Sequence, residues 1–242
     1  MGFIVEPIDG SFQVVRIGGY QGLSNVVNFE IFSSKTGQWK DKSASFNLPV
    51  HLFLARQMFT YCHSVPCKKI LHWMEYDGRI VAYDTSQTDT ENDETIRCRV
   101  IDLPGDRNND KVTTGTIGVC QDHLRYCHVA YWSQIENVRV WELRKSNNEG
   151  EGNWFLLYRM RLDEINMYQW VLPVAFHPLD PDIVYLVRQR RRLLTSLNLR
   201  TRVWRDLIPV KGVVNYSTVF AFVLPVWPTP IPQISLTPLG LQ

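Results

Sequence analysis

The sequence lacks the charge imbalance and the long apolar runs that mark two large classes of protein. Its 242 residues hold 26 Lys and Arg against 24 Asp and Glu, a formal net charge of +2. Dedicated nucleic-acid-binding domains are usually strongly basic, so we expect no nucleic-acid partner. The longest apolar run, residues 219–227, is broken by Pro225 and is too short to cross a bilayer. We therefore expect no membrane partner.

Cysteine is scarce, and its pattern argues against a disulfide framework. The five residues follow no framework spacing: Cys62, Cys67, Cys98, Cys120 and Cys127. The N-terminus carries no secretory signal pattern. Because disulfides are rare in reducing compartments, we interpret these residues as free thiols and expect a cytoplasmic location, a nuclear one, or both.

Catalytic motifs are missing as well. There is no G-x-S-x-G elbow, P-loop or His-Glu-x-x-His sequence. Acidic residues are plentiful, but no spacing pairs two of them for glycoside hydrolysis. His72 has no partner that would activate it, and we interpret it as a buried histidine beside the packed indole of Trp73. We therefore expect no enzyme, no catalytic residue and no cofactor.

One group of residues has the composition of a metal site. Its members lie close together in the sequence: Cys120, His123, Cys127 and His128. Structural zinc sites favour two matched pairs of ligands. Cys62, His63 and Cys67 would supply a second half only if folding brought the two segments together. Neighbours on a strand point to opposite faces, so we expect buried or half-buried side chains here and no metal.

Strand signals dominate what the sequence does contain. Short segments rich in β-branched and aromatic residues are separated by turn formers; we expect strands at 12–17, 27–32, 79–83, 95–103, 138–143, 154–161, 183–187 and 219–224. Only residues 50–61 are compatible with a helix, and a long connection fits them equally well. The sequence predicts an all-β protein.

A repeated sequence motif indicates the architecture. Phe32 is followed by a turn and Trp39, and Leu197 is followed in the same way by Trp204. The strand before each turn is marked by Phe32, Tyr83, Trp141 and Leu197, at separations of 51, 58 and 56 residues. This period approaches the roughly 50 residues of kelch-like propeller blades. We expect a β-propeller of about four units, with Trp39 and Trp204 packed between neighbouring sheets.

The distribution of units predicts how the propeller begins and ends. The first predicted strand of the repeat lies near Phe12. The last predicted strand, 219–224, belongs to no complete unit and precedes a Pro-rich tail that starts at about residue 225. We therefore expect one partial propeller domain over residues 1–242, incomplete at its N-terminus. A closed ring of four blades is the alternative.

The chain resembles the C-terminal, F-box-associated propeller region of plant F-box proteins. The phrases that carry the resemblance are 12–17, 29–39, 71–73, 77–84, 101–104, 140–143, 177–185 and 227–232. The resemblance implies a propeller that selects protein substrates for a ubiquitin ligase, joined to an F-box that docks a Skp-type adaptor. No F-box segment is present in this sequence, so we expect adaptor binding only if an F-box lies upstream.

These observations predict a protein-interaction module that recognises a protein substrate. We expect one rim of the propeller to bind it, through the loops 18–25, 85–94, 105–111 and 146–153. A propeller enzyme with a central-channel site and a shortened product with little function of its own are the alternatives. Residues 188–211 hold eight basic residues, and residues 84–94 hold five acidic ones. We interpret the two runs as solvated surface. The alternatives are an electrostatic binding surface for an acidic partner and, at 188–192, a nuclear-import signal.

Overall fold

The computed structural model describes residues 2–5, 10–18, 23–50, 64–75, 78–86, 95–104, 112–132, 135–145, 152–161 and 171–210. These residues form strands and turns and contain no helix, so the all-β prediction is confirmed. No helix of the described chain is long and apolar enough to cross a membrane. Residues 50–61 and 219–224 fall, apart from Val50, outside the described residues.

The first two sheets come from the N-terminal half of the chain. Each contains four antiparallel strands in chain order. Their strands are β1 (Gly2–Val5), β2 (Phe12–Gly18), β3 (Ser24–Ser33) and β4 (Gln38–Val50), then β5 (Ser64–Cys67), β6 (Ile70–Met74), β7 (Arg79–Asp84) and β8 (Cys98–Asp102). A parallel bridge between Ser43 and Thr95 joins the two sheets near their outer strands.

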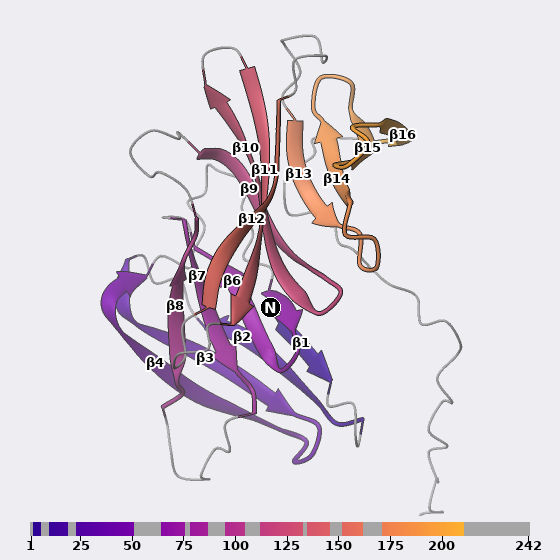
Figure 1. The fold of residues 1–242 in the computed structure, drawn as a ribbon. Helices are drawn as coiled ribbons and strands as arrows, with labels where there is room; N and C mark the ends of the chain where they lie inside the picture. The colour runs from indigo at the N-terminus through magenta and orange to yellow at the C-terminus, as the bar shows by residue number, and fades with distance from the viewer. Residues whose placement is uncertain are drawn as a thin grey trace, which may run out of the picture.

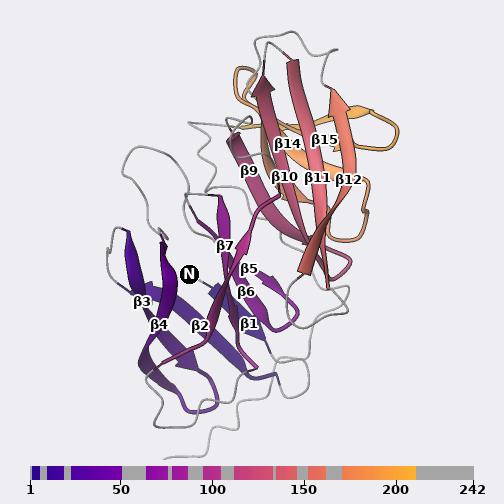
Figure 2. The ribbon, with the colours of Figure 1, turned by 60° about the vertical axis from the view of Figure 1, so that its left-hand side comes forward.

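The third and fourth sheets repeat the same plan. Their strands are β9 (Val112–Cys120), β10 (His123–Trp132), β11 (Ile135–Lys145) and β12 (Gly152–Arg161), then β13 (Val171–Phe176), β14 (Ile183–Arg188), β15 (Leu193–Asn198) and β16 (Trp204–Pro209). Figures 1 and 2 show the four sheets following one another in chain order, with β1–β4 and β13–β16 at opposite ends of the row.

The first strand of each sheet is its innermost strand. β1 contacts β5, β5 contacts β9, and β9 contacts β13. Sheets that turn about a line of first strands in this way are the blades of a β-propeller, as the repeat period predicts. For each sheet we call the face toward the preceding sheet the leading face and the opposite face the trailing face.

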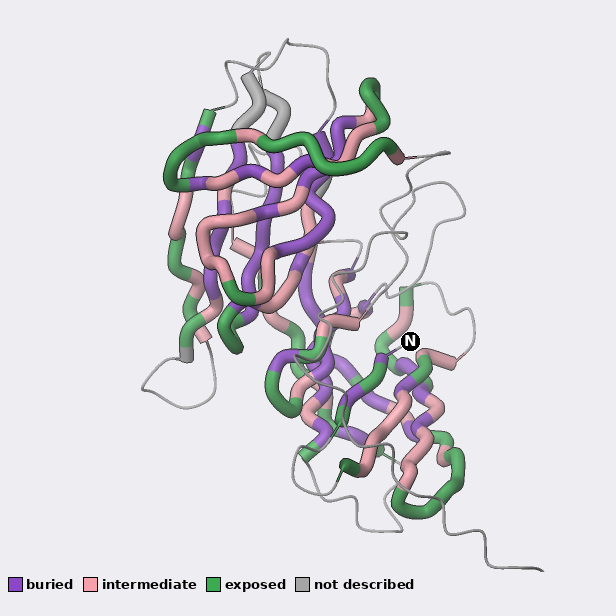
Figure 3. The backbone as a smooth tube through the Cα atoms, turned by 90° about the vertical axis from the view of Figure 1, so that its right-hand side faces the viewer, coloured by how far each residue is buried: buried purple, intermediate pink, exposed green. Residues whose placement is uncertain are grey.

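Apolar clusters fill the spaces between successive sheets. Their members include Phe29, Trp73 and Tyr83 between the first and second sheets, Ile80, Tyr126 and Trp141 between the second and third, and Val140, Phe176 and Leu197 between the third and fourth. Figure 3 shows buried residues along the middle of the strands and exposed residues on turns and outer strands. Each sheet therefore buries its apolar side chains by stacking on its neighbours.

The repeat markers occupy one structural position. Phe32, Tyr83, Trp141 and Leu197 all lie on the third strand of their sheets. The last three are buried on the leading face, against the preceding sheet. The sequence period therefore reports the real blade repeat.

The two motif tryptophans differ in environment, which corrects one expectation. Trp204 lies on the leading face of the fourth sheet and packs into the cluster shared with the third, as predicted. Trp39 pairs with Phe32 on the leading face of the first sheet, and 52% of its surface is exposed. The prediction that Trp39 packs between two sheets is wrong for the described part of the chain, because no described sheet precedes β1–β4.

Hydrogen bonds tie the sheets together at their ends. The Arg79 guanidinium donates to the Pro49 carbonyl at 2.7 Å, from the second sheet to the first. The Trp154 indole N–H donates to the Asp102 carbonyl at 2.8 Å, from the third sheet to the second. Arg125 of the third sheet donates to the Pro181 carbonyl beside the fourth, also at 2.8 Å. The blades are thus joined by polar contacts as well as by their cores.

Candidate interaction surface

Most residues of the four predicted binding loops lie outside the described chain, but the ends of the strands that flank these loops lie on two rims. Segments 85–94 and 105–111 lie before and after β8, so they leave from opposite ends of that strand. Because β9, β10 and β11 alternate in direction, segment 146–153 shares the rim of 85–94. The parallel bridge between β4 and the segment entering β8 places 18–25 with 105–111. The flanking strands thus attach these loops in two pairs, one at each rim, and the loops' part in binding stays a prediction.

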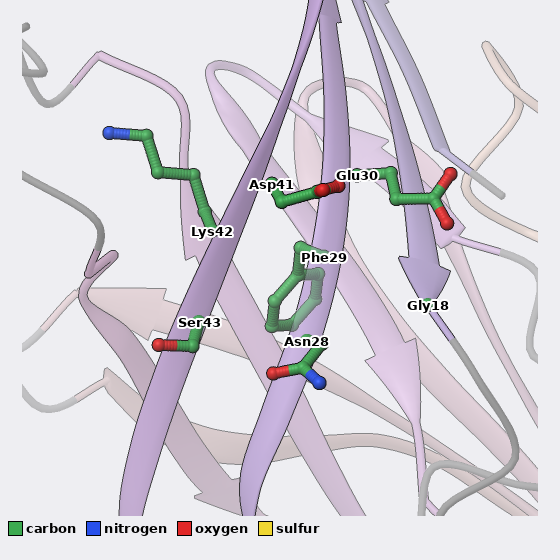
Figure 4. Close-up of a pocket in the computed structure, with 7 residues that line it drawn as sticks. All are labelled: Gly18, Asn28, Phe29, Glu30, Asp41, Lys42 and Ser43. Atoms are coloured by element: carbon green, nitrogen blue, oxygen red, sulfur yellow. The ribbon is translucent and has the colours of Figure 1, made fainter.

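A hollow opens on the sheet β1–β4, beside the rim where β2 and β8 end. Its volume is about 460 Å³, and its lining comes from three strands: Gly18, Asn28, Phe29, Glu30, Asp41, Lys42 and Ser43. Gly18 ends β2 and has no side chain, which leaves room between the strand ends. Figure 4 shows Asp41 turned toward Glu30, while Lys42 points to the other side of the sheet.

Two acidic residues line this hollow. Glu30 and Asp41 are directly paired in the register of β3 and β4. Like charges directly opposite each other on a sheet are destabilising. Arg16 on β2 offsets part of this repulsion, since its Nε donates to Glu30 Oε2 at 2.7 Å. The geometry therefore favours a cation near Asp41, and the acidic hollow is the candidate site.

An aromatic row covers the rest of this leading face. The rings of Phe3, Phe12, Phe32 and Trp39 follow one another with centroid separations of 5.4, 5.9 and 5.4 Å. The Arg16 guanidinium lies over the Trp39 ring, 5.6 Å from its centroid. The acidic hollow and the aromatic row thus lie at two ends of the leading face of β1–β4.

Sequence reasoning did not find the acidic hollow. The signal was present within β3, where polar Asn28 and Glu30 alternate with apolar Phe29 and Ile31. This period-two pattern places Glu30 on the face opposite the core. The partner Asp41 could be identified only once the register of β3 and β4 was known.

The cysteine and histidine cluster is dispersed over two faces. Gln121 and Asp122 form a turn, so Cys120 and His123 lie on different strands. Cys127 is buried in the cluster between the third and fourth sheets. His128 is buried on the other face and stacks on Trp141, with ring centroids 5.0 Å apart. Burial raises the pKa of Cys127 strongly, which favours the neutral thiol over a thiolate ligand.

The described residues contain no group of three or more His, Cys, Asp and Glu side chains arranged to hold a metal. Cys62 and His63, the other half of the candidate set, lie outside the described chain. Cys67 is buried, and its thiol donates to the Asp122 carbonyl at 3.5 Å.

His72 and the basic run have clear structural positions. His72 is buried, and its Nδ1 lies 3.2 Å from the Val65 carbonyl oxygen, as expected of a core histidine. Arg188 is buried beneath the fourth sheet's leading face, over the Trp204 ring and 3.6 Å from Asp206. Exposed basic charge at 188–192 is therefore confined to Arg190, Arg191 and Arg192. The acidic run mostly lies outside the described residues.

The comparisons with known proteins agree with this architecture. The family model of the F-box protein At3g26010-like β-propeller matches residues 5–211. The chain belongs to this family. Two Arabidopsis thaliana proteins named as F-box (At3g23950) and F-box/kelch-repeat (At1g15680) proteins are each 27% identical to it, over 74% and 71% of this chain. The aligned parts span 41% and 39% of those relatives, so the family propeller described here matches less than half of their length.

Among solved structures, prolyl oligopeptidase B from Galerina marginata aligns with a TM-score of 0.39 and 14% identity. The alignment covers 86% of this chain and 28% of the oligopeptidase chain. Nothing about the activity of the present chain follows from that likeness.

Proposed function

We propose that the chain is the substrate-recognition module of an F-box ubiquitin-ligase receptor, and that it binds its protein target at the rim next to the acidic hollow. The observation that carries the proposal is the hollow of about 460 Å³ at the edge of a family propeller. Loops and cavities on a rigid scaffold are common binding sites. The loops 18–25 and 105–111 border the same rim.

The charge of the hollow favours a basic group on the target. Glu30 is partly offset by Arg16, whereas Asp41 faces it from the next strand. A Lys or Arg side chain of the target would pair with the exposed carboxylate of Asp41. Aromatic and aliphatic neighbours of that side chain would contact the aromatic row.

The experiment compares proteins captured from plant-cell extract by the tagged chain and by its Asp41→Lys variant. Reversing this charge should deplete a specific captured protein at least tenfold. Asp122→Asn changes an exposed acidic residue on the opposite rim and should leave capture unchanged. The proposal fails if the wild-type chain and the Asp41→Lys variant capture the same proteins in equal amounts.

The link to the ligase needs its own test. A chimera that carries an F-box segment ahead of the full chain should co-purify a Skp-type adaptor and lower the level of the captured protein. The chain without that segment should capture the protein but not the adaptor. Recovery of no adaptor with either form would contradict the ligase role, whatever the target.

The enzyme alternative and the location have separate readouts. A propeller enzyme would require converging carboxylates or two His, Tyr or Cys side chains at ligand distance along the line of first strands. The relatives are named as an F-box protein and an F-box/kelch-repeat protein, which supports a binding role. The cytoplasm and the nucleus are our proposed locations, and a fluorescent fusion with Arg190, Arg191 and Arg192 changed to Ala tests nuclear import.

A further inference from the structure

The segment between β13 and β14 fastens the fourth sheet to the third. Three of its backbone carbonyls accept hydrogen bonds from the third sheet: Pro178 from the Gln121 amide at 2.9 Å, Leu179 from the Gln121 side chain at 3.1 Å and Pro181 from Arg125 at 2.8 Å. The Asp182 carboxylate accepts a further hydrogen bond from the Tyr158 hydroxyl. Residues 177–182, which we call the junction turn, therefore join two sheets mainly through their own backbone.

One imidazole holds the shape of the junction turn. His177 Nδ1 accepts hydrogen bonds from the backbone N–H of Leu179 at 3.2 Å and from that of Asp180 at 2.8 Å. A ring nitrogen accepts only when it carries no proton, so the proton of the neutral ring lies on Nε2. These two hydrogen bonds order the residues whose carbonyls reach the third sheet. His177 is half-buried, so protons from solvent can reach it.

Charged and titratable groups surround the junction turn from both sheets. They are Asp180, Asp182, Tyr185 and Arg200 on the fourth sheet, and Cys120, Asp122, His123, Arg125 and Glu142 on the third. Arg200 pairs with Asp182, and Arg125 pairs with Glu142, each at 2.8 Å. The Asp180 carboxylate instead accepts the backbone N–H of Asp182 at 2.9 Å. Its negative charge is therefore available to attract a protonated imidazole in the same turn.

We propose that the junction turn is a pH-sensitive latch between the third and fourth sheets, and that it is released when His177 gains a proton. Histidine is the side chain that ordinarily changes charge between about pH 5 and 8. The protonated ring donates at both nitrogens, so the N–H groups of Leu179 and Asp180 lose their acceptor and face a positive charge. The latch is closed at neutral pH and opens as the pH falls. The apolar core between the two sheets stays packed.

The latch lies on the rim opposite to the acidic hollow. β13 ends and β14 begins at the junction turn, on the rim that also carries segments 85–94 and 146–153. The latch therefore changes the arrangement of one rim and leaves the proposed target site on the other rim intact. Its test is independent of whether the hollow binds a target.

Hydrogen exchange followed by mass spectrometry, at pH 7.5 and pH 5.5, tests the latch in the full chain. Rates are corrected for the intrinsic effect of pH on exchange. Peptides that cover 177–183 and 120–126 should lose about tenfold of their protection at the lower pH, because one proton opens the turn. Peptides from β2 and β3 should keep their protection. The position of each peptide separates this loss from any effect of His72, which lies on β6.

Two substitutions of His177 separate its hydrogen bonds from its charge. His177→Asn places a side-chain oxygen near the position of Nδ1 and does not titrate, so the junction turn should be protected at both pH values. His177→Gln places its oxygen farther along the side chain, so the turn should be poorly protected at both. His123→Asn, at the exposed first residue of β10, is the matched control and should retain the pH dependence of the unmodified chain.

Two outcomes would overturn the proposal. The first is equal protection of 177–183 at both pH values in the unmodified chain. The second is a His177→Asn variant with the pH dependence of the unmodified chain, which assigns the effect to another group. Circular dichroism confirms that each variant folds. If His177→Asn does not fold, an NMR titration of the unmodified chain decides, and amide shifts of Leu179 and Asp180 that do not follow the titration of the His177 ring contradict the latch.

Discussion

Single buried residues set how the stability of this protein responds to pH. His72 is 3% exposed on β6, and burial lowers its pKa to about 4, with the positive charge of Arg99 adding to the effect. The neutral imidazole is therefore the form that the folded state accepts. Protonation in the unfolded chain begins near pH 6.5. The contribution of His72 is thus fully present above pH 6.5 and is lost as the pH falls toward 4.

We expect this residue to cost about 2 kcal/mol of folding stability on going from pH 7 to pH 5. Urea unfolding of the chain and of His72→Gln at both pH values measures the difference. Gln can still donate to the Val65 carbonyl but does not titrate, so its stability should change less with pH. His123→Gln, at the exposed first residue of β10, should retain the pH dependence of the unmodified chain. Equal pH dependence of His72→Gln and the unmodified chain would contradict the assignment.

The Arg125 guanidinium belongs to a second buried polar group. It donates to Glu142 Oε2 at 2.8 Å and to the Pro181 carbonyl, and Arg144 donates to the other carboxylate oxygen at 3.0 Å. Burial opposes ionisation of Glu142, but the hydrogen bonds from Arg144 and Arg125 hold its pKa below the usual value. Arg125→Ala should lower the free energy of unfolding by about 3 kcal/mol, because it leaves a buried carboxylate short of a partner.

The exposed pair of Arg16 and Glu30 offers a comparison for Arg125. Its Arg side chain is 59% exposed, so solvent screens the interaction. Arg16→Ala should cost less than about 1 kcal/mol. Chemical denaturation of the two variants under one set of conditions gives both values, and equal losses would contradict the importance of burial here.

At the scale of one hairpin, the turn between β9 and β10 is strained by its residues. Gln121 and Asp122 have φ values of 50° and 60°, the signature of a two-residue turn that favours Asn and Gly. Asp122→Gly should stabilise the protein by roughly 0.5–1 kcal/mol, and the carbonyl that accepts the Cys67 thiol is retained. Gly37→Ala, at φ 66°, should have the opposite sign. Melting temperatures of both variants test the pair, and a lower value for Asp122→Gly would contradict the prediction.

Prediction from sequence succeeded for elements whose pattern is local. The strands expected at 12–17, 79–83 and 183–187 coincide with β2, β7 and β14 within one residue. β4 was harder to predict from the sequence, because Gln38–Val50 carries many polar residues on its exposed face. β13 has apolar residues on both faces, which removes the alternation that identifies a half-buried strand.

The sequence could not predict what depends on pairs of distant strands. Trp39 and Trp204 have the same local phrase, but their exposure depends on whether a sheet lies in front of them. The acidic hollow likewise depends on the register that sets Asp41 opposite Glu30. The sequence period predicted the number of sheets, whereas the packing and charge of each face follow from the order of sheets in space.

At the scale of the whole molecule, stability depends on how closely the first strands approach one another. Gly118 lies on β9 where β13 packs against it, and a Cβ added there would lie 2.7 Å from Phe176 Cδ2. Phe176 is 2% exposed in the core between the third and fourth sheets, so its ring has little space to move. Gly118→Ala should therefore lower the free energy of unfolding by about 1–3 kcal/mol.

The damage at Gly118 should be repaired from the neighbouring sheet. Phe176→Leu added to Gly118→Ala removes the clashing ring atoms, so the double variant should lose less stability than the sum of the two single changes. Gly18→Ala is a matched control, because its nearest neighbours lie at 3.6 Å, an ordinary van der Waals contact. Urea unfolding followed by circular dichroism and tryptophan fluorescence measures the unmodified chain and the four variants. Additive losses from Gly118→Ala and Phe176→Leu would show that the junction between these two sheets is not closely packed.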